Sequence, residues 1–299
     1  MAIATRCLDD FLSILTSREV TFLIGPSRMA FHVNEKLVAS CSEVFRKMLT
    51  NRMRESQEGV VELDDVEPRV FTSFIQYTLC GNYQVPGPVD EMEIVVETGD
   101  KEALFLRDWE LWSFATRPRT FDINGKPLSS PQYAAAFIRQ GDACMPYAKP
   151  PGLPAREISD TDEYVDLSFA ESRFAMICGH HVKLYIFADM YDVVDLRQLC
   201  LHRLHRSLAY RLLRSVVHAK LGDAEYQHLF DAVAFVFENT CTGDKIRKLF
   251  VQACAADFSL VCLMSGYKDL CLRVPEVAYE MTMELHIKRT EHYSGKAIE

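Results

Sequence analysis

Hydrophobic residues in the first 85 positions recur with two different periods, which predicts a mixture of helices and strands. Residues 8–15 carry leucine and phenylalanine side chains three or four positions apart, as on one face of an amphipathic helix. Residues 20–24 and 29–33 instead alternate hydrophobic and polar side chains, with the turn-forming run Gly25–Arg28 between them. A short helix followed by a β-hairpin is therefore expected.

Helical spacing returns after the hairpin. It predicts one helix over residues 35–49, and a short strand over residues 59–63 follows. Pro68 suits the first turn of the next helix, where its missing N–H costs nothing, and Gly81 suits the position just after the end of that helix. This order of elements is typical of an α+β fold, in which helices cover a small sheet.

Residues 86–178 break the pattern, and we interpret them as a long insertion. Nine of the twelve prolines lie in this segment, and its first part is acidic. Residues 92–115 are hydrophobic enough to form strands, whereas residues 116–163 look irregular. Trp109 and Trp112 either anchor a partner or pin the insertion onto the body of the protein, and we favour the second interpretation.

Helical patterns resume at about residue 180 and continue to the end of the chain. Asp195 and Gln198 are spaced as in a capping box, which predicts a helix start. Later hydrophobic stripes, including one that opens at Pro275, predict an all-helical C-terminal extension. We therefore divide the chain into four segments, which are residues 1–85, 86–178, 179–210 and 211–299.

Two separated blocks of the sequence resemble the BTB/POZ family. Residues 31–45, FHVNEKLVASCSEVF, are similar to the family signature, and the resemblance continues to Gly81. Residues 182–204 resemble the final helix pair of the family, and residues 231–258 are similar to the helical tails of BTB proteins of the fungal type. Two positions depart from the family pattern: Asn34 replaces the usual histidine, and Leu79-Cys80 replaces an aromatic-threonine pair.

The resemblance implies a BTB/POZ fold in two parts, residues 1–85 and 179–210, on either side of the insertion. It implies a protein–protein interaction module that homodimerises and recruits partners, and one use of such modules is as substrate adaptors of cullin-type ubiquitin ligases. The alternative is a chromatin-associated transcriptional regulator that acts through BTB-mediated assembly.

Two groups of residues are the candidates for contact with other chains. Faces on the two N-terminal helices are expected to carry dimer packing as well as core packing; their residues are Leu8, Phe11, Leu12, Leu15, Leu37 and Cys41. Aromatic rings, which can bury one side and leave their edge in contact with water, are expected to face a partner. These rings are Phe71, Tyr77, Tyr83, Tyr185 and Tyr191.

Charge and motif content argue against other classes of protein. The formal net charge of −9 disfavours a nucleic-acid binder. A run of basic residues could still form a local patch, but we favour a solvated helix face; it comprises Arg197, His202, Arg203, His205, Arg206, Arg211, Arg214 and Lys220. Cys200, His202 and His205 lack an evident fourth zinc ligand, so no metal or cofactor is expected. The sequence contains no GxSxG, P-loop, GxGxxG or HExxH motif, and we expect no enzyme.

The sequence also bears on the compartment. The ten cysteines form no CxxC pair, which is typical of a reducing environment. Asp9 and Asp10 interrupt the N-terminal hydrophobic run that a signal peptide would need, and no stretch approaches the roughly 18 hydrophobic residues of a membrane helix. A cytoplasmic or nuclear protein without membrane contact is expected.

Overall fold

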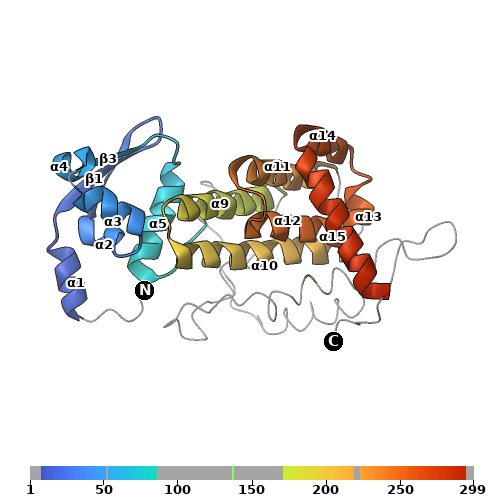
Figure 1. Ribbon diagram of the computed structural model, residues 1–299, viewed down its shortest axis with the longest axis horizontal. Coiled ribbons are helices and arrows are strands. Elements are labelled where there is room, and N and C mark those ends of the chain that lie inside the picture. The colour runs from blue at the N-terminus through green and yellow to red at the C-terminus, as the bar shows by residue number, and fades with distance from the viewer. Residues whose placement is uncertain (1–7, 52, 86–136, 138–170, 219–222, 294–299) are drawn as a thin grey trace, which may run out of the picture. The chain divides into compact units, whose positions relative to one another are not determined.

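The structure, a computed structural model, describes residues 8–51, 53–85, 137, 171–218 and 223–293 (Figure 1). The chain divides into two compact units. The N-terminal unit includes residues 1–91 and 179–202, and the C-terminal unit includes residues 163–178 and 203–299. The division falls within the two helices α9 and α10, at 178/179, which is also a boundary expected from the sequence, and at 202/203 rather than at 210/211.

The sheet of the N-terminal unit has three strands in the order β2-β1-β3, with bounds Glu19–Ile24 for β1, Met29–Asn34 for β2 and Val60–Leu63 for β3. The central strand β1 pairs antiparallel with β2 and parallel with β3, so that Phe22 lies opposite both Phe31 and Val61. The hairpin between β1 and β2 confirms the alternating pattern of the sequence. At its turn Gly25 has φ of +69°, and a Cβ there would lie 3.2 Å from the carbonyl oxygen of Val66.

Five helices accompany the sheet in the first part of the unit: α1 Leu8–Leu15, α2 Glu35–Ala39, α3 Glu43–Thr50, α4 Arg54–Glu58 and α5 Pro68–Cys80. Helix α5 begins at proline and ends at Gly81, whose φ is +73°, as predicted. The single helix expected over 35–49 is wrong, because two helices occupy that segment. The side chain of Ser42 accepts a hydrogen bond from the backbone N–H of Phe45 and so starts α3 as a new helix.

An aromatic cluster forms the core of the N-terminal unit. Phe45, which is fully buried, stacks on Tyr191 with ring centroids 4.4 Å apart and meets Phe22 edge-on at 5.6 Å. Phe74 and Phe187 close the cluster with their own contacts at 5.1 Å. The rings come from β1, α3, α5 and α9, so the cluster joins residues on both sides of the segment 86–170.

Helices α9, Glu171–Met190, and α10, Val194–His218, contribute to both units. Helix α9 begins earlier than the expected position near 180, inside the segment interpreted as an insertion. After three polar residues, residues 174–178 form a continuous hydrophobic run up to Gly179, without the periodic polar positions that reveal an amphipathic helix. Helix α10 begins at Val194, so Asp195 lies in its first turn rather than at its N-cap.

The remaining helices build the C-terminal unit: α11 Asp223–Asn239, α12 Lys245–Ala256, α13 Phe258–Val261, α14 Ser265–Arg273 and α15 Pro275–Tyr293. Helix α11 packs on α12 and α14, and α15 packs on α12 and α14 (Figure 1). The all-helical extension is confirmed in these residues, and α15 begins at Pro275 as the sequence predicts. Within the described parts of the chain, every helix is too short or too polar to cross a membrane.

Buried polar side chains tie the helices of the C-terminal unit together. The Tyr226 hydroxyl donates to the Asp257 carboxylate at 2.6 Å, and the Arg211 guanidinium lies 4.3 Å from the centre of the Tyr226 ring. Arg247 is also buried and donates to the carbonyl oxygen of Phe237 at 2.6 Å. Such groups hold the helices in one arrangement, because a buried donor or acceptor without a partner is costly.

Candidate interaction surfaces

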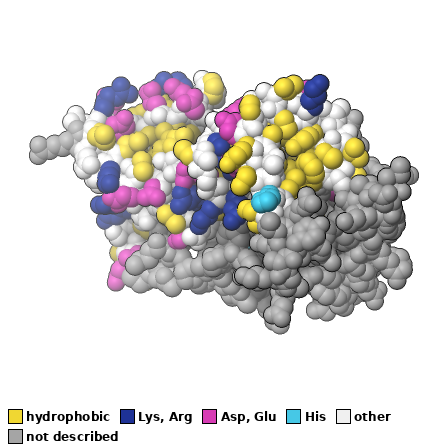
Figure 2. Space-filling model, turned by 45° about the vertical axis from the view of Figure 1, so that its right-hand side comes forward, with side chains coloured by type: hydrophobic (Ala, Val, Ile, Leu, Met, Phe, Trp, Pro, Cys, Tyr) yellow, Lys and Arg dark blue, Asp and Glu magenta, His cyan; other side chains and the backbone are white. Residues whose placement is uncertain are grey.

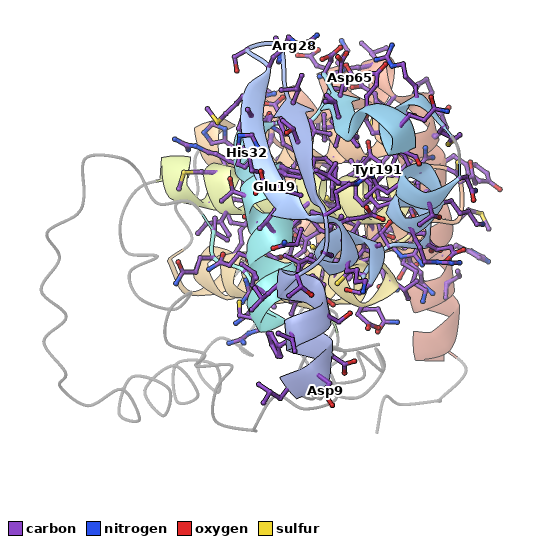
Figure 3. The ribbon with its side chains drawn as sticks, turned by 90° about the vertical axis from the view of Figure 1, so that its left-hand side faces the viewer. Asp9, Glu19, Arg28, His32, Asp65 and Tyr191 are labelled. Carbon is purple, nitrogen blue, oxygen red and sulfur yellow. The ribbon has the colours of Figure 1, made fainter. Side chains whose placement is uncertain are left out.

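Helix α1 exposes most of its hydrophobic side chains. Leu12 and Leu15 are 60% and 68% exposed, and Leu8 and Phe11 also lie at the surface, whereas Ile14 is buried against the unit. An eight-residue helix with one buried and four exposed large hydrophobic side chains leaves an unusually apolar face in water. Asp9 lies on the same helix, far from the hairpin turn that carries Arg28 (Figure 3).

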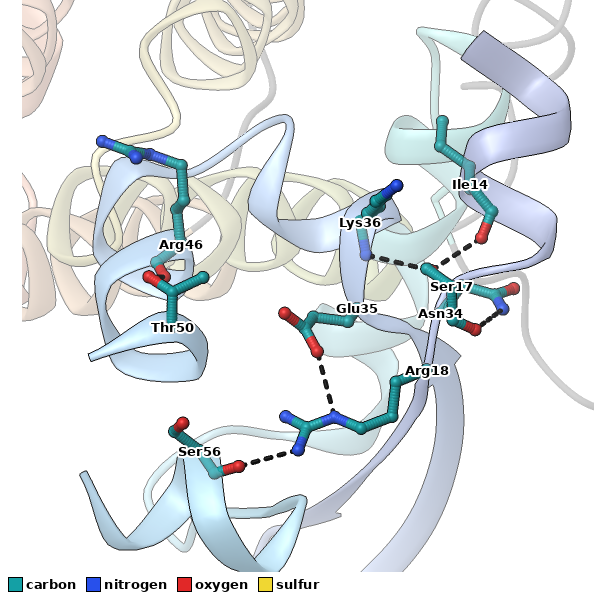
Figure 4. Close-up of polar contacts among 9 residues, drawn as sticks. All are labelled: Ile14, Ser17, Arg18, Asn34, Glu35, Lys36, Arg46, Thr50 and Ser56. Carbon is teal, nitrogen blue, oxygen red and sulfur yellow. Dashed lines mark hydrogen bonds and ion pairs between the residues drawn. The ribbon is translucent and has the colours of Figure 1, made fainter. Parts of the chain in front are cut away.

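Polar contacts fix the end of α1 against β2 and α2 (Figure 4). The Ser17 hydroxyl donates to the carbonyl oxygen of Ile14 at 2.7 Å and accepts from the backbone N–H of Lys36 at 3.3 Å. The Asn34 amide donates to the carbonyl oxygen of Ser17 at 3.4 Å. Asn34, which departs from the family pattern, therefore binds backbone of the α1 segment. These contacts hold α1 in place while its hydrophobic face stays exposed.

The other two dimer-face candidates lie differently. Leu37 is buried and Cys41 is half-buried, so neither belongs to the exposed face of α1. We define the α1 face as Leu8, Phe11, Leu12 and Leu15. Hydrophobic side chains also reach the surface on the C-terminal unit, where Tyr279, Met283 and Ile287 follow one side of α15. Figure 2 shows one view in which exposed hydrophobic side chains lie beside charged ones.

The five aromatic rings expected to face a partner are buried in the N-terminal unit, so their placement differs from that expectation. Phe71 lies 5.0 Å from Phe22, and Tyr191 stacks on Phe45. The hydroxyl of Tyr83 is hydrogen-bonded to Nδ1 of His181 at 2.8 Å. An amphipathic ring satisfies its hydroxyl inside the protein as readily as at a wet surface, and the hydrophobic area of the ring favours the interior. Tyr185 is buried as well.

Tyr77 differs from the other four rings because it lines a pocket of about 440 Å³. The segment from Ala39 to Arg46, between and within α2 and α3, forms one side of the pocket. Asp192 and Val193, in the connection between α9 and α10, and Val194 and Asp195, in the first turn of α10, form the other side. The hydroxyl of Ser42 joins the two sides, because it donates to the carbonyl oxygen of Tyr191 at 2.5 Å.

Acidic side chains outnumber basic ones among the residues that line this pocket. Arg46 is engaged by Glu43, with Nε 2.7 Å from a carboxylate oxygen, and this hydrogen bond and the nearby positive charges hold the pKa of Glu43 below its usual range. Asp192 and Asp195 add two carboxylates. Burial raises the pKa of the Tyr77 hydroxyl, and the negative charge of Asp195 raises it further. Tyr77 is therefore a neutral phenol beside an acidic rim.

Sequence reasoning did not find this pocket. The residue type of Asp192 is the one local sign in the sequence that the chain turns here, because Asp and Asn tolerate the left-handed region better than most residues. In the structure, Asp192 follows the buried Tyr191 and has φ of +53°. The residues across the pocket are far away in the sequence, as the 149 positions between Ser42 and Tyr191 show, and periodicity carries no information on such contacts.

The basic residues of α10 do not form one exposed stripe in the described residues. Arg203 and Arg211 are buried, and Arg197 pairs with Asp189. Arg214 and Lys220 lie outside the described side chains. Cys200 is buried 3.5 Å from the Tyr83 hydroxyl, and His205 is hydrogen-bonded to the carbonyl oxygen of Phe137. Among the described residues, no group of three His, Cys, Asp or Glu side chains is arranged to hold a metal ion.

Residues 15–101 match the family model of the BTB/POZ domain. The match begins at the end of α1 and includes the sheet, α2, α3, α4 and α5. Residues 86–101 of the match, and the tryptophans Trp109 and Trp112 beyond it, lie outside the described residues. The helix pair α9 and α10 also lies beyond the match, although residues 179–202 belong to the same compact unit as the sheet. Domains of this family mediate protein–protein interactions.

Proposed function

This chain contains a BTB/POZ domain, and we propose that the chain is a protein-interaction module that pairs with a second copy of itself and recruits further protein partners. The observation that carries the pairing is the α1 face. Its side chains are large, hydrophobic and exposed, on a helix whose end is fixed by Ser17 and Asn34. Burial of such a face against an identical one would stabilise the pair by about 25 cal/mol for each Å² of hydrophobic surface that is removed from water. A closed pair also uses the same patch on both copies, as twofold symmetry requires.

We expect a change of Leu12→Asp to weaken self-association at least ~10-fold, because a carboxylate would have to be desolvated without a partner inside the pair. The measurement is a pull-down between two copies of the full chain that carry different tags. Met53→Asp is the matched control, since Met53 is similarly exposed in the same unit but lies at the N-cap of α4, where aspartate is favourable. Equal retention of the wild-type chain and the Leu12→Asp variant would contradict the role of the α1 face.

Recruitment of a cullin scaffold is a narrower form of the proposal, and it rests on the domain family rather than on a described contact. It is tested by a pull-down of the full chain with a cullin N-terminal domain. Retention of the cullin domain would support the adaptor role. Its absence would contradict the adaptor role but would not bear on the proposed self-association. We do not propose the chromatin role through the basic residues of α10, because Arg203 and Arg211 are buried and the net charge is negative.

A further inference from the structure

Arg211, on helix α10, is a buried arginine with a guanidinium that is only partly satisfied. The residue is 7% exposed, and two of its nitrogen atoms, Nε and Nη2, are buried without a hydrogen-bond partner. A charged donor that gives up water without gaining an acceptor costs more free energy than a neutral donor does. The guanidinium of Arg211 therefore calls for an acceptor that the described residues do not supply.

Aromatic rings surround this guanidinium but offer no oxygen acceptor to its Nε and Nη2 atoms. The centre of the Tyr226 ring, in the first turn of α11, lies 4.3 Å from the guanidinium carbon, and the centre of the Phe174 ring, on α9, lies 6.0 Å from it. The N–H groups of Nε and Nη2 lie side by side on one edge of the planar group. This edge can donate two parallel hydrogen bonds to the two oxygen atoms of one oxyanion.

Arg247 shows how the same unit accommodates another buried arginine. Arg247 is also 7% exposed, and its guanidinium carbon lies 4.5 Å from the centre of the Phe237 ring. Its Nε donates to the Thr240 hydroxyl at 3.0 Å, and its Nη2 donates to the carbonyl oxygen of Phe237 at 2.6 Å. The same two atoms of Arg211 meet no such oxygen atoms among the described residues. An aromatic contact alone therefore does not complete a buried arginine in this unit.

The charge near Arg211 favours a carboxylate over a phosphate. The Asp257 carboxylate accepts a hydrogen bond from the Tyr226 hydroxyl at 2.6 Å, and it does not bind the Nε or Nη2 atom of Arg211. Burial raises the pKa of Tyr226, and the negative charge of Asp257 raises it further, so the hydroxyl stays neutral. Because Asp257 already brings one negative charge, a phosphate, with more than one charge near pH 7, would be repelled more strongly than a carboxylate.

From these observations we infer that the Nε and Nη2 edge of Arg211 binds a small molecule that carries a carboxylate group. Each of the two N–H groups donates to one carboxylate oxygen, and the rings of Tyr226 and Phe174 supply hydrophobic contact for the rest of the molecule. A side chain on the surface of a partner does not reach this edge, because Arg211 is buried within the C-terminal unit. The inference goes beyond the proposed self-pairing, which uses the α1 face.

The test is thermal unfolding of the full chain in buffer without carboxylates, and then with sodium acetate or sodium benzoate that replaces sodium chloride at constant ionic strength. We expect either carboxylate to raise the Tm of the wild type by about 2–4 °C and to reach saturation, because a ligand that binds only the folded state stabilises it. Arg211→Met, which lacks the donors, should not respond. Arg273→Met is the matched control: it removes an exposed arginine of the same unit and should respond as the wild type does.

The Arg211→Met variant also identifies the source of the carboxylate. In buffer without carboxylates, the variant should fold and have a Tm at least as high as that of the wild type. Methionine packs well against aromatic rings, and the change removes a buried charge without a partner. A Tm lower than that of the wild type by about 6 °C or more would show that a carboxylate of the chain itself pairs with Arg211, and it would overturn the small-molecule site.

Three other results would also overturn the inference. A wild-type Tm that neither carboxylate changes would leave a buried water as the partner of Arg211. An equal rise in the wild type and in the Arg211→Met variant would show a general effect of the added salt. A rise with sodium phosphate but with neither carboxylate would show that the charge argument is wrong. None of these results concerns the light-scattering mass, so failure of this site is distinguishable from failure of the proposed self-pairing.

Discussion

Replacement of Phe45 by alanine should lower the free energy of unfolding by about 3–5 kcal/mol, among the largest losses expected of any single change in this chain. Phe45 is fully buried and contacts rings from four different segments: Phe22 in β1, Phe74 in α5, Phe187 in α9, and Tyr191. Alanine removes the ring from the centre of the cluster, and the surrounding rigid aromatic rings fill the cavity only in part. The loss should appear in both the β1 and the α9 segments, because the cluster joins them.

Urea unfolding followed by circular dichroism measures this loss, and amide hydrogen exchange in β1 and α5 assigns it to the N-terminal unit. Leu79→Ala is the matched control: Leu79 is 55% exposed on α5, and its truncation should change stability by about 0.5 kcal/mol or less. A Phe45→Ala variant as stable as the control would show that the aromatic cluster does not form the core of this unit.

Replacement of Arg247 by alanine should destabilise the C-terminal unit by about 3 kcal/mol. The buried guanidinium donates to the carbonyl oxygen of Phe237 and to the hydroxyl and carbonyl oxygens of Thr240, at the end of α11, and it stacks over the Phe237 ring at 4.5 Å. Its removal takes the donor from the buried carbonyl oxygen of Phe237 and from the half-buried oxygens of Thr240, and this cost exceeds that of a lost surface ion pair. The change can be measured by urea unfolding with hydrogen exchange in α11 and α12.

Arg273→Ala is the matched control for Arg247. Arg273 is exposed and pairs with Glu238 at 2.7 Å, and exposed ion pairs contribute little, so its removal should leave the urea midpoint almost unchanged. If the Arg247→Ala variant were no less stable than the Arg273→Ala variant, the buried hydrogen bonds of Arg247 would not hold α11 and α12 together.

The Arg247 variant should also respond to pH through Glu280. Burial raises the pKa of Glu280, while the charge of Arg247, 3.8 Å away, opposes that rise. Without Arg247 the folded-state pKa rises further above the unfolded value, so the folded state binds its proton more tightly. Stability is then lost as pH rises through this range, and the destabilisation should be larger at about pH 7 than at about pH 4.

Local sequence signals predicted the parts of the fold that local physics determines. The hairpin, the bounds of α5 and the start of α15 follow from a glycine turn and from prolines at helix starts, each of which acts within a few residues. The division between α2 and α3 was missed because the hydrophobic stripe runs through both helices. Ser42 separates them, and its bond to the carbonyl oxygen of Tyr191 depends on a residue 149 positions away.

The interaction sites were predicted less well, for a related reason. The sequence placed hydrophobic residues on one face of α1, but periodicity cannot say whether such a face packs inside or stays exposed, and here Leu12 and Leu15 remain exposed while Leu37 is buried. The position of an aromatic ring in the sequence likewise does not say whether the ring is buried or exposed, and the rings expected at the surface are buried in the core. Tyr77 is buried too, but it also lines a pocket beside the α9–α10 connection.

The light-scattering mass of the purified full chain, measured over a range of concentrations, tests the central claim most directly. The claim is that the BTB/POZ domain pairs two copies through the α1 face, and it predicts twice the chain mass of 34.2 kDa for the wild type and 34.2 kDa for the Leu12→Asp variant. A wild-type mass of 34.2 kDa at every concentration, or an unchanged doubled mass in the variant, would contradict it.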